Sequence, residues 1–237
     1  MKIRGERECQ SCGSRWSYYE TGSITCPECG SIRSVGVDDR TEHTDNPASL
    51  DLGPVREALD GDTLAQVAER AVEQCRAYTR ERGFVRGGEL QPLDARYVAA
   101  VELRHVAAEL ARTIRISDDE ELYFLSMVRG AESGERPPPS EVPDSLAAPR
   151  GLATATIIDD YRRDLTRYLS DNRDSQARTT MGRFVDHRKR IAALDGAVPV
   201  ETSESLVQAL TDLSYYAVSG DESVLAAARE RLDSLEV

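Results

Sequence analysis

Four of the five cysteines form two closely spaced pairs, Cys9-x-x-Cys12 and Cys26-x-x-Cys29. Each pair places two thiolates on one turn, and two such turns supply the four soft ligands of a tetrahedral zinc ion. A glycine follows each pair and permits the positive φ at which backbone N–H groups point at the sulfurs. We predict one Zn²⁺ ion per chain, bound by these four cysteines. Because four ligands leave no position for water, the predicted role is structural.

Other uses of the same cysteines fit the sequence less well. Disulfides are rare in cytosolic proteins, and no βαβ pattern surrounds either pair, as a redox C-x-x-C would require. The knuckles are also similar to those of rubredoxin, and spacing alone does not separate zinc from iron. Rubrerythrin-type proteins join such knuckles to a di-iron helical bundle, which needs two Glu-x-x-His motifs. Only Glu102 and His105 provide one.

Glu102 and His105 belong to a polar stripe that continues with Glu109 and Arg112 at helical spacing. Such a stripe is usually a solvated helix face, and we interpret it in this way. A second metal site on this stripe is the alternative.

The segment between the cysteine pairs predicts a small β structure. Residues 15–20 are rich in aromatic side chains and predict a strand, residues 21–23 a turn and residues 24–25 a second short strand. A third strand is predicted over residues 31–37. With its C-x-x-C-G knuckles, this region resembles the zinc ribbon of the archaeal and eukaryotic transcription factor B group. The whole chain resembles uncharacterised haloarchaeal proteins that carry such a ribbon.

The resemblance implies a three-stranded ribbon held by zinc, and it covers about the first forty residues. In transcription factor B the ribbon docks on RNA polymerase and precedes two cyclin-like repeats that hold DNA. This sequence shows neither an internal repeat nor enough length for two such repeats, so the promoter-binding role does not carry over. Zinc ribbons also occur in ribosomal proteins, polymerase subunits and enzymes, so the motif predicts metal and fold better than function.

The elements beyond the ribbon are predicted to be helices. Residues 1–40 form the predicted ribbon, 41–51 a polar connector and 52–237 an α-helical domain. Helices are indicated near 55–59, from a capping box at Thr63 to Gly83, from Pro92 to Arg115, from Ser117 to Gly130, and four times in the last third. Residues 130–150, rich in proline and glycine, predict a loop that either splits this domain or crosses one bundle. The apolar spacing buries Cys75 in the core.

The charge of the chain excludes two classes of protein. There are 30 Lys plus Arg against 42 Asp plus Glu, a formal charge of -12, and only two of the cations are lysines. A globally basic nucleic-acid binder is excluded, and no apolar stretch is long enough to span a membrane. We therefore expect a cytoplasmic protein. An acidic, lysine-poor composition resembles that of halophilic archaea, in which carboxylates keep surfaces hydrated in concentrated salt.

Residues 161–190 depart from this acidity with nine cations and four anions. Arginine contacts phosphate in bidentate fashion and stacks on bases, so this segment is a candidate nucleic-acid or partner site. The alternative is that its arginines pair with acidic helices of the same bundle. The candidate side chains are Arg178, Arg183, Arg188, Lys189 and Arg190.

These observations favour a non-enzymatic zinc-ribbon adaptor. Its ribbon would present Arg15, Trp16, Tyr18 and Tyr19 to a transcription or translation machine, and its helical domain would contact nucleic acid or a second protein. No P-loop, nucleophile elbow or dinucleotide motif occurs, and no small-molecule substrate is indicated. The alternative function is that of a rubredoxin- or rubrerythrin-like iron redox protein.

Overall fold

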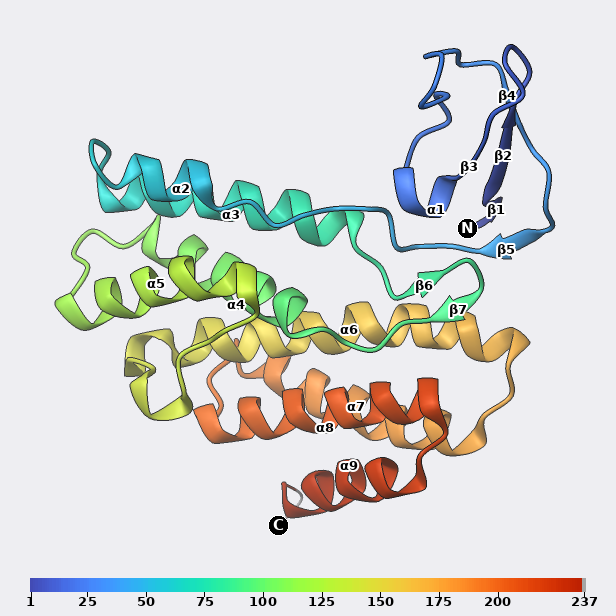
Figure 1. The fold of residues 1–237 in the computed structure, drawn as a ribbon. Coiled ribbons are helices and arrows are strands. Elements are labelled where there is room, and N and C mark those ends of the chain that lie inside the picture. Colours follow the sequence, from blue (N-terminus) through green and yellow to red (C-terminus); the bar gives the residue numbers. More distant parts are fainter. Residues whose placement is uncertain (236–237) are drawn as a thin grey trace.

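The computed structural model describes residues 1–235 and confirms the predicted fold class, a small β part followed by a helical domain. The β part lies at one corner of the molecule, beside the stacked helices (Figure 1). The predicted helical domain was drawn to residue 237, and residues 236 and 237 lie outside the described residues.

The N-terminal β part has two small antiparallel sheets. In the three-stranded sheet, β2 (Glu6–Cys9) lies between β3 (Arg15–Ser17) and β4 (Ser34–Gly36). The second sheet pairs β1 (Lys2–Arg4) with β5 (Arg40–Glu42). The prediction of a strand over residues 15–20 was correct only at its start, because α1 (Tyr18–Thr21) makes one helical turn that ends at Gly22 with φ 61°.

The strand predicted at residues 24–25 was wrong. These residues do not pair, and the central strand β2 comes instead from the chain before the first cysteine. The reason is the register: Arg7 lies opposite Trp16 on one side and Gly36 on the other, so β2 already fills the place beside β3. The ribbon is therefore built around residues 6–9.

Eight helices of the described residues form the helical domain, and their number and order agree with the predicted helical segments. Both predicted capping boxes are present, Thr63 with Gln66 and Ser117 with Glu120. The third predicted helix was drawn too long; it begins after Asp94, whose carboxylate accepts from the backbone of Tyr97. The helices are α2 (Gly53–Ala58), α3 (Leu64–Glu81), α4 (Ala95–Leu110), α5 (Asp118–Gly130), α6 (Ala147–Asp171), α7 (Ser175–Ala193), α8 (Val200–Ser219) and α9 (Glu222–Ser234).

One apolar core runs through this domain, from Leu50 to Leu232. Helices α4 and α6 lie in the middle of the stack, with α3 on one side and α7 and α8 on the other (Figure 1). Cys75 is fully buried in this core, as its spacing predicted, and burial raises the pKa of its thiol to about 12. No helix within residues 1–235 has the length and apolarity needed to cross a membrane.

Residues 130–150 are not the irregular loop that their composition predicted. They contain three short 3-10 helices, η1 (Ala131–Ser133), η2 (Pro139–Glu141) and η3 (Asp144–Leu146), and α6 begins at Ala147. Arg150, at the start of α6, is 2% exposed. The segment is ordered because its side chains reach into the core, as Leu146 does with no exposed surface.

A short hairpin joins the ribbon to the helices. It consists of β6 (Val85–Arg86) and β7 (Glu89–Leu90), which like β5 lie beyond residue 37, where only a connector and helices were predicted. The backbone N–H of Thr44 donates to Val85 O at 2.8 Å, and that of Gly88 donates to Glu42 O at 2.8 Å. The chain after the ribbon is thus hydrogen-bonded along the hairpin.

One buried carboxylate fastens this junction to α6. Asp164 accepts from the Thr44 hydroxyl at 2.6 Å and from the backbone N–H of Phe84 at 2.8 Å. Nearby, Asp45 is buried between Arg82 at 2.8 Å and Arg86 at 3.0 Å. Each contact joins residues distant in sequence, so the connector has a defined place on the helical domain, and β1 pairs with β5 at the start of this connector.

Candidate metal centre and surrounding sites

The four cysteines predicted to bind metal come together in the structure. All four sulfurs lie within 4.8 Å of one another. Cys9 Sγ is 3.6 Å from Cys29 Sγ, and Cys12 Sγ is 3.7 Å from Cys26 Sγ. A tetrahedral zinc site with Zn–S bonds of about 2.3 Å has sulfur–sulfur edges of about 3.8 Å, so the cluster fits a four-thiolate metal ion. All five cysteines of the chain are free thiols, which disagrees with the disulfide alternative.

The turn that follows Cys9 favours the thiolate form of this cysteine. The Ser11 backbone N–H donates to Cys9 Sγ at 3.4 Å and lowers the pKa of this thiol to about 6. The glycines after the pairs have φ values of 77° at Gly13 and 70° at Gly30, the left-handed region that side chains disfavour. Cys9 and Cys26 are buried, whereas Cys12 and Cys29 reach the surface.

Trp16 is not presented to a partner. It is 8% exposed and packs with Cys9 and Cys26 in a small core of its own, and its indole N–H donates to Ser23 O at 3.0 Å. Tyr19 also faces inward, since its ring lies 4.7 Å from that of His43 and its hydroxyl is 2.6 Å from Thr41 Oγ1. These aromatic side chains stabilise the ribbon and its junction.

Tyr18 and Arg15 remain accessible. Arg15 is exposed and pairs with Glu8 at 2.6 Å. Tyr18 lines a groove of about 380 Å³ on the ribbon. We call this the ribbon groove; it is lined by Lys2, Ile3, Arg4, Arg7, Tyr18, Ile24, Gly36 and Arg40. Four of these side chains are cationic and none is anionic.

The basic segment 161–190 makes many contacts within the chain. Arg183 pairs with Asp233 at 2.7 Å, and Lys189 pairs with Asp186 at 3.1 Å. Arg188 lies 3.9 Å from Asp159, and Arg178 donates to Leu169 O at 3.1 Å. Arg190 is exposed in the last turn of α7. These pairs fit the alternative of internal neutralisation, and nucleic-acid binding by the segment stays a prediction.

The polar stripe that begins on α4 is solvated only at its C-terminal end, where Glu109 and Arg112 form an exposed ion pair. The predicted solvated face was wrong for Glu102 and His105. Glu102 is 2% exposed, accepts from the Tyr123 hydroxyl and pairs with Arg136 at 2.7 Å. His105 lies 3.1 Å from Thr156 Oγ1. The helix lies in the middle of the bundle, so neighbouring helices cover the part of this face around Glu102 and His105. Among residues 1–235 only the four cysteines gather three or more metal-ligating side chains, so the stripe provides no di-iron centre.

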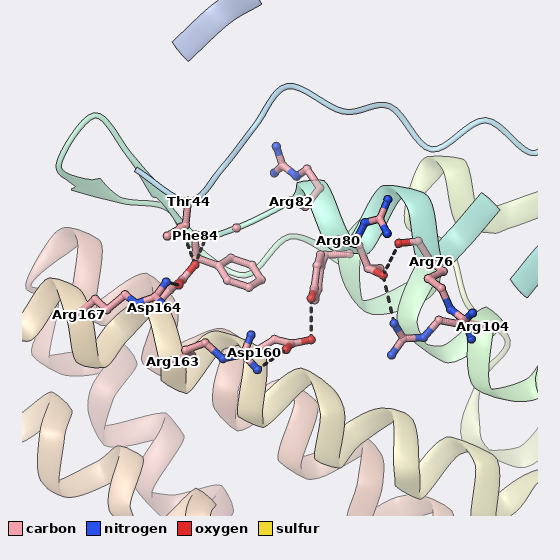
Figure 2. Close-up of a pocket in the computed structure, with 13 residues that line it drawn as sticks. Thr44, Arg76, Arg80, Arg82, Phe84, Arg104, Asp160, Arg163, Asp164 and Arg167 are labelled. Carbon is pink, nitrogen blue, oxygen red and sulfur yellow. Dashed lines mark hydrogen bonds and ion pairs between the residues drawn. The ribbon is translucent and has the colours of Figure 1, made fainter. Parts of the chain in front are cut away.

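A second concave site lies between α3, α4 and α6, with a volume of about 450 Å³. We call it the arginine pocket. Figure 2 shows that its charged side chains come from all three helices. The residues that line it include six arginines and two aspartates: Arg76, Arg80, Arg82, Arg104, Arg163, Arg167, Asp160 and Asp164.

This pocket is not predictable from the sequence, because its members are far apart in the chain. Arg76 and Arg80 lie in a segment that is acidic on average, and their spacing of four residues shows only that they share a helix face. Whether this face lies against Arg104 and α6 depends on the tertiary structure. Arg163 and Arg167 do belong to the predicted basic segment.

Comparison with known proteins identifies a family. A family model described as "Family of unknown function (DUF7117)" matches residues 1–232. No curated protein and no solved structure matches the chain.

Proposed function

The chain belongs to DUF7117, a family of unknown function, and from its own residues we propose that it is a non-enzymatic adaptor whose zinc-bound ribbon docks on a protein. The ribbon groove is the observation that carries the proposal. Its cations and Tyr18 would contact an acidic protein surface. The resemblance to the transcription factor B ribbon suggests a subunit of a transcription or translation machine as the partner.

The metal supports this proposal through the fold. Four thiolates complete a tetrahedral shell, so the ion would have no open position for a substrate. The core around it contains only Cys9, Trp16 and Cys26 among buried apolar residues. So small a core needs a metal to be stable. We infer that Zn²⁺ is the bound ion and that its role is to hold the groove in shape.

Exposed apolar side chains adjoin the groove in sequence and favour a protein partner. Ile32 is 74% exposed, and Val35 and Val37 are exposed on and after β4. Ile24, half exposed, lines the groove itself. Apolar side chains beside cations are typical of protein interfaces, in which an apolar centre is surrounded by polar contacts.

Metal analysis tests the ion. Protein purified without added metal should contain one zinc per chain and show no visible absorption. A red iron–thiolate spectrum with one iron per chain would instead support the rubredoxin-like alternative and contradict the zinc assignment.

Binding to purified machines tests the adaptor. RNA polymerase and ribosomes from a halophilic archaeon are immobilised in concentrated KCl, and retention of the purified protein is measured. We expect one of them to retain the wild type, and the charge reversal Arg40→Glu and the apolar change Ile24→Glu each to weaken retention at least tenfold.

Matched controls lie on the helical domain. Arg115→Glu makes the same charge change on an exposed residue, and Ile114→Glu makes the same apolar change at a residue that is 99% exposed. Both controls should bind like the wild type. Retention of the wild type by neither machine, or equal loss in the controls, would rule out docking through the ribbon groove.

A further inference from the structure

The arginine pocket gathers positive charge that the chain itself does not neutralise. Among residues 1–235, Arg76, Arg80 and Arg104 form no ion pair. Arg104 donates only to neutral groups, the Thr79 hydroxyl at 3.2 Å and the His105 ring at 3.5 Å. Like charges in one concave site repel, so their gathering there is unfavourable in the absence of an anion.

The two carboxylates of the pocket are already engaged. Asp160 accepts from the Tyr97 hydroxyl at 2.8 Å and pairs with Arg163 at 3.2 Å. Asp164 holds the junction and also pairs with Arg167 at 3.2 Å. Figure 2 shows both carboxylates on the α6 wall. They leave the arginines of α3 and α4 without a partner.

The composition of the chain makes these unpaired arginines informative. Carboxylates outnumber cations by 42 to 30, and each of the other three arginines that line the pocket has a carboxylate partner. Arg82, for example, pairs with both Asp45 and Asp94. A carboxylate beside each of the three arginines would neutralise them, and the described part of the chain places none within ion-pair distance. Exposed arginines elsewhere, such as Arg115 and Arg190, also form no ion pair with the described residues, but these three share one concave site, and this convergence points to an anion from outside.

Phosphate is the anion that this set of donors suits best. A guanidinium presents its N–H groups in a planar fork that matches two phosphate oxygens, with charge-assisted hydrogen bonds. Arg76 and Arg80 are one helical turn apart on α3, and Arg104 projects from the neighbouring α4. Three forks from two helices can contact more than one phosphate group.

Size and charge distinguish a small ligand from a polymer. The volume of about 450 Å³ is that of a small-molecule site, for which the usual range is about 300–1,000 Å³. A long polyanion would have to extend from the pocket across the surface of a chain whose net charge is -12. We propose that the arginine pocket binds a small molecule with two or more phosphate groups, held by Arg76, Arg80 and Arg104.

Calorimetric titration of the full chain in KCl tests this site with pyrophosphate as the probe and inorganic phosphate as the smaller comparison. We expect one saturable site per chain, with pyrophosphate binding more tightly than phosphate. Replacing Arg104 by Gln should weaken pyrophosphate binding roughly tenfold or more, because one charge-assisted contact is worth about 1.5–3 kcal/mol. The double change Arg76→Gln with Arg80→Gln should weaken it further.

The control is Arg115→Gln, which removes an exposed arginine outside the pocket and should bind as the wild type does. Circular dichroism and the melting temperature show whether each variant folds. Because Arg76 and Arg80 are exposed, their double variant can still be used if Arg104→Gln does not fold. No saturable binding to the wild type at millimolar probe, or equal binding by the double variant, would overturn the proposal. Tighter binding of a single-stranded RNA, lost in the same variants, would replace the small ligand by a polymer.

Discussion

Four charged side chains and one tyrosine form a buried or nearly buried polar network in the helical domain. Glu102 and Glu204 both pair with Arg136, at 2.7 Å and 3.0 Å, and Arg150 pairs with Glu204 at 2.6 Å. The Tyr123 hydroxyl donates to Glu102. Two negative and two positive charges thus balance inside the bundle. Such a network specifies how the helices that carry it are arranged. Removing one of its charged members leaves another charge buried without a partner.

Removing Glu102 should therefore destabilise the protein strongly. We expect Glu102→Leu to lower the free energy of unfolding by about 3–5 kcal/mol, because it leaves Arg136 and Arg150 to share one carboxylate. Urea denaturation followed by circular dichroism measures the change. Glu109→Gln, which removes an exposed pair with Arg112 on the same helix, should change it by less than about 1 kcal/mol. Similar losses in both variants would contradict the importance of the network.

His105 should make the stability depend on pH. Burial, with a further contribution from Arg104, lowers the pKa of His105 to about 4, compared with an ordinary value of 6.5. As the pH falls from 6.5 towards 4 the unfolded chain takes up a proton that the folded chain does not, so the free energy of unfolding decreases in this window, by on the order of 3 kcal/mol at its lower end.

The variant His105→Gln isolates this effect, because it can still hydrogen-bond to Thr156 and cannot titrate. Denaturation of both proteins at several pH values from neutral to acid gives their free energies of unfolding, and the difference between the two is the effect of His105. The wild type should lose more stability than the variant as the pH falls. Parallel curves would show that His105 does not contribute.

At the residue scale, the sequence predicts the role of a side chain correctly where that role depends on local spacing. The four cysteines lie within 21 residues and met as expected. Glu102 and Trp16 did not follow their predicted exposure, because a neighbouring helix or strand decides what covers them. The same reason hid Arg104, whose pocket needs α3 and α6 to be placed first.

Among the elements, the ribbon should respond to metal removal separately from the helices. Trp16 is the only tryptophan and lies in the ribbon core, which is distinct from the helical core. We expect a strong chelator to shift Trp16 emission to the red, as the ribbon unfolds and exposes the indole, while the far-UV circular dichroism of the helices changes little.

Readdition of zinc should restore the original emission. The control is Cys75→Ala, which removes a cysteine that is not a candidate ligand and should respond to the chelator as the wild type does. Unchanged emission after measured metal loss, or joint loss of the helical signal, would contradict separate unfolding.

Long periodic helices were predictable, and short elements were not. Helix α3 has a capping box at Thr63 and a regular apolar stripe, which are properties of its own sequence. The hairpin of β6 and β7 has only two residues in each strand, too few to show alternation. In residues 130–150, prolines indicated a loop, whereas Leu146 and Arg150 fix the segment by contacts with the core.

For the whole molecule, the junction between ribbon and helices should depend on Asp164. The change Asp164→Ala removes acceptors for Thr44 and leaves the Phe84 N–H without its buried partner, at a cost of about 1–3 kcal/mol. We expect faster cleavage of residues 43–51 by a protease at low concentration, measured by mass spectrometry of the fragments.

Asp171→Ala is the matched control, because Asp171 also links α6 to the ribbon, through an exposed pair with Lys2 at 3.0 Å. Exposed pairs contribute little, so its cleavage rate should stay close to that of the wild type. Equal rates for Asp164→Ala and the wild type would mean that the hairpin alone holds the junction.

During synthesis the ribbon can form before its junction with the helices, because the contacts of the ribbon come from an earlier part of the chain. All four cysteines and the three strands around them are complete once residue 36 has emerged, so metal can be captured early. The junction must wait for the hairpin at residues 85–90 and then for Asp164, which follows the last ribbon strand by more than a hundred residues. For much of translation the nascent ribbon can therefore hold its metal while only a flexible chain joins it to the ribosome, and the later helices then fix it in the molecule.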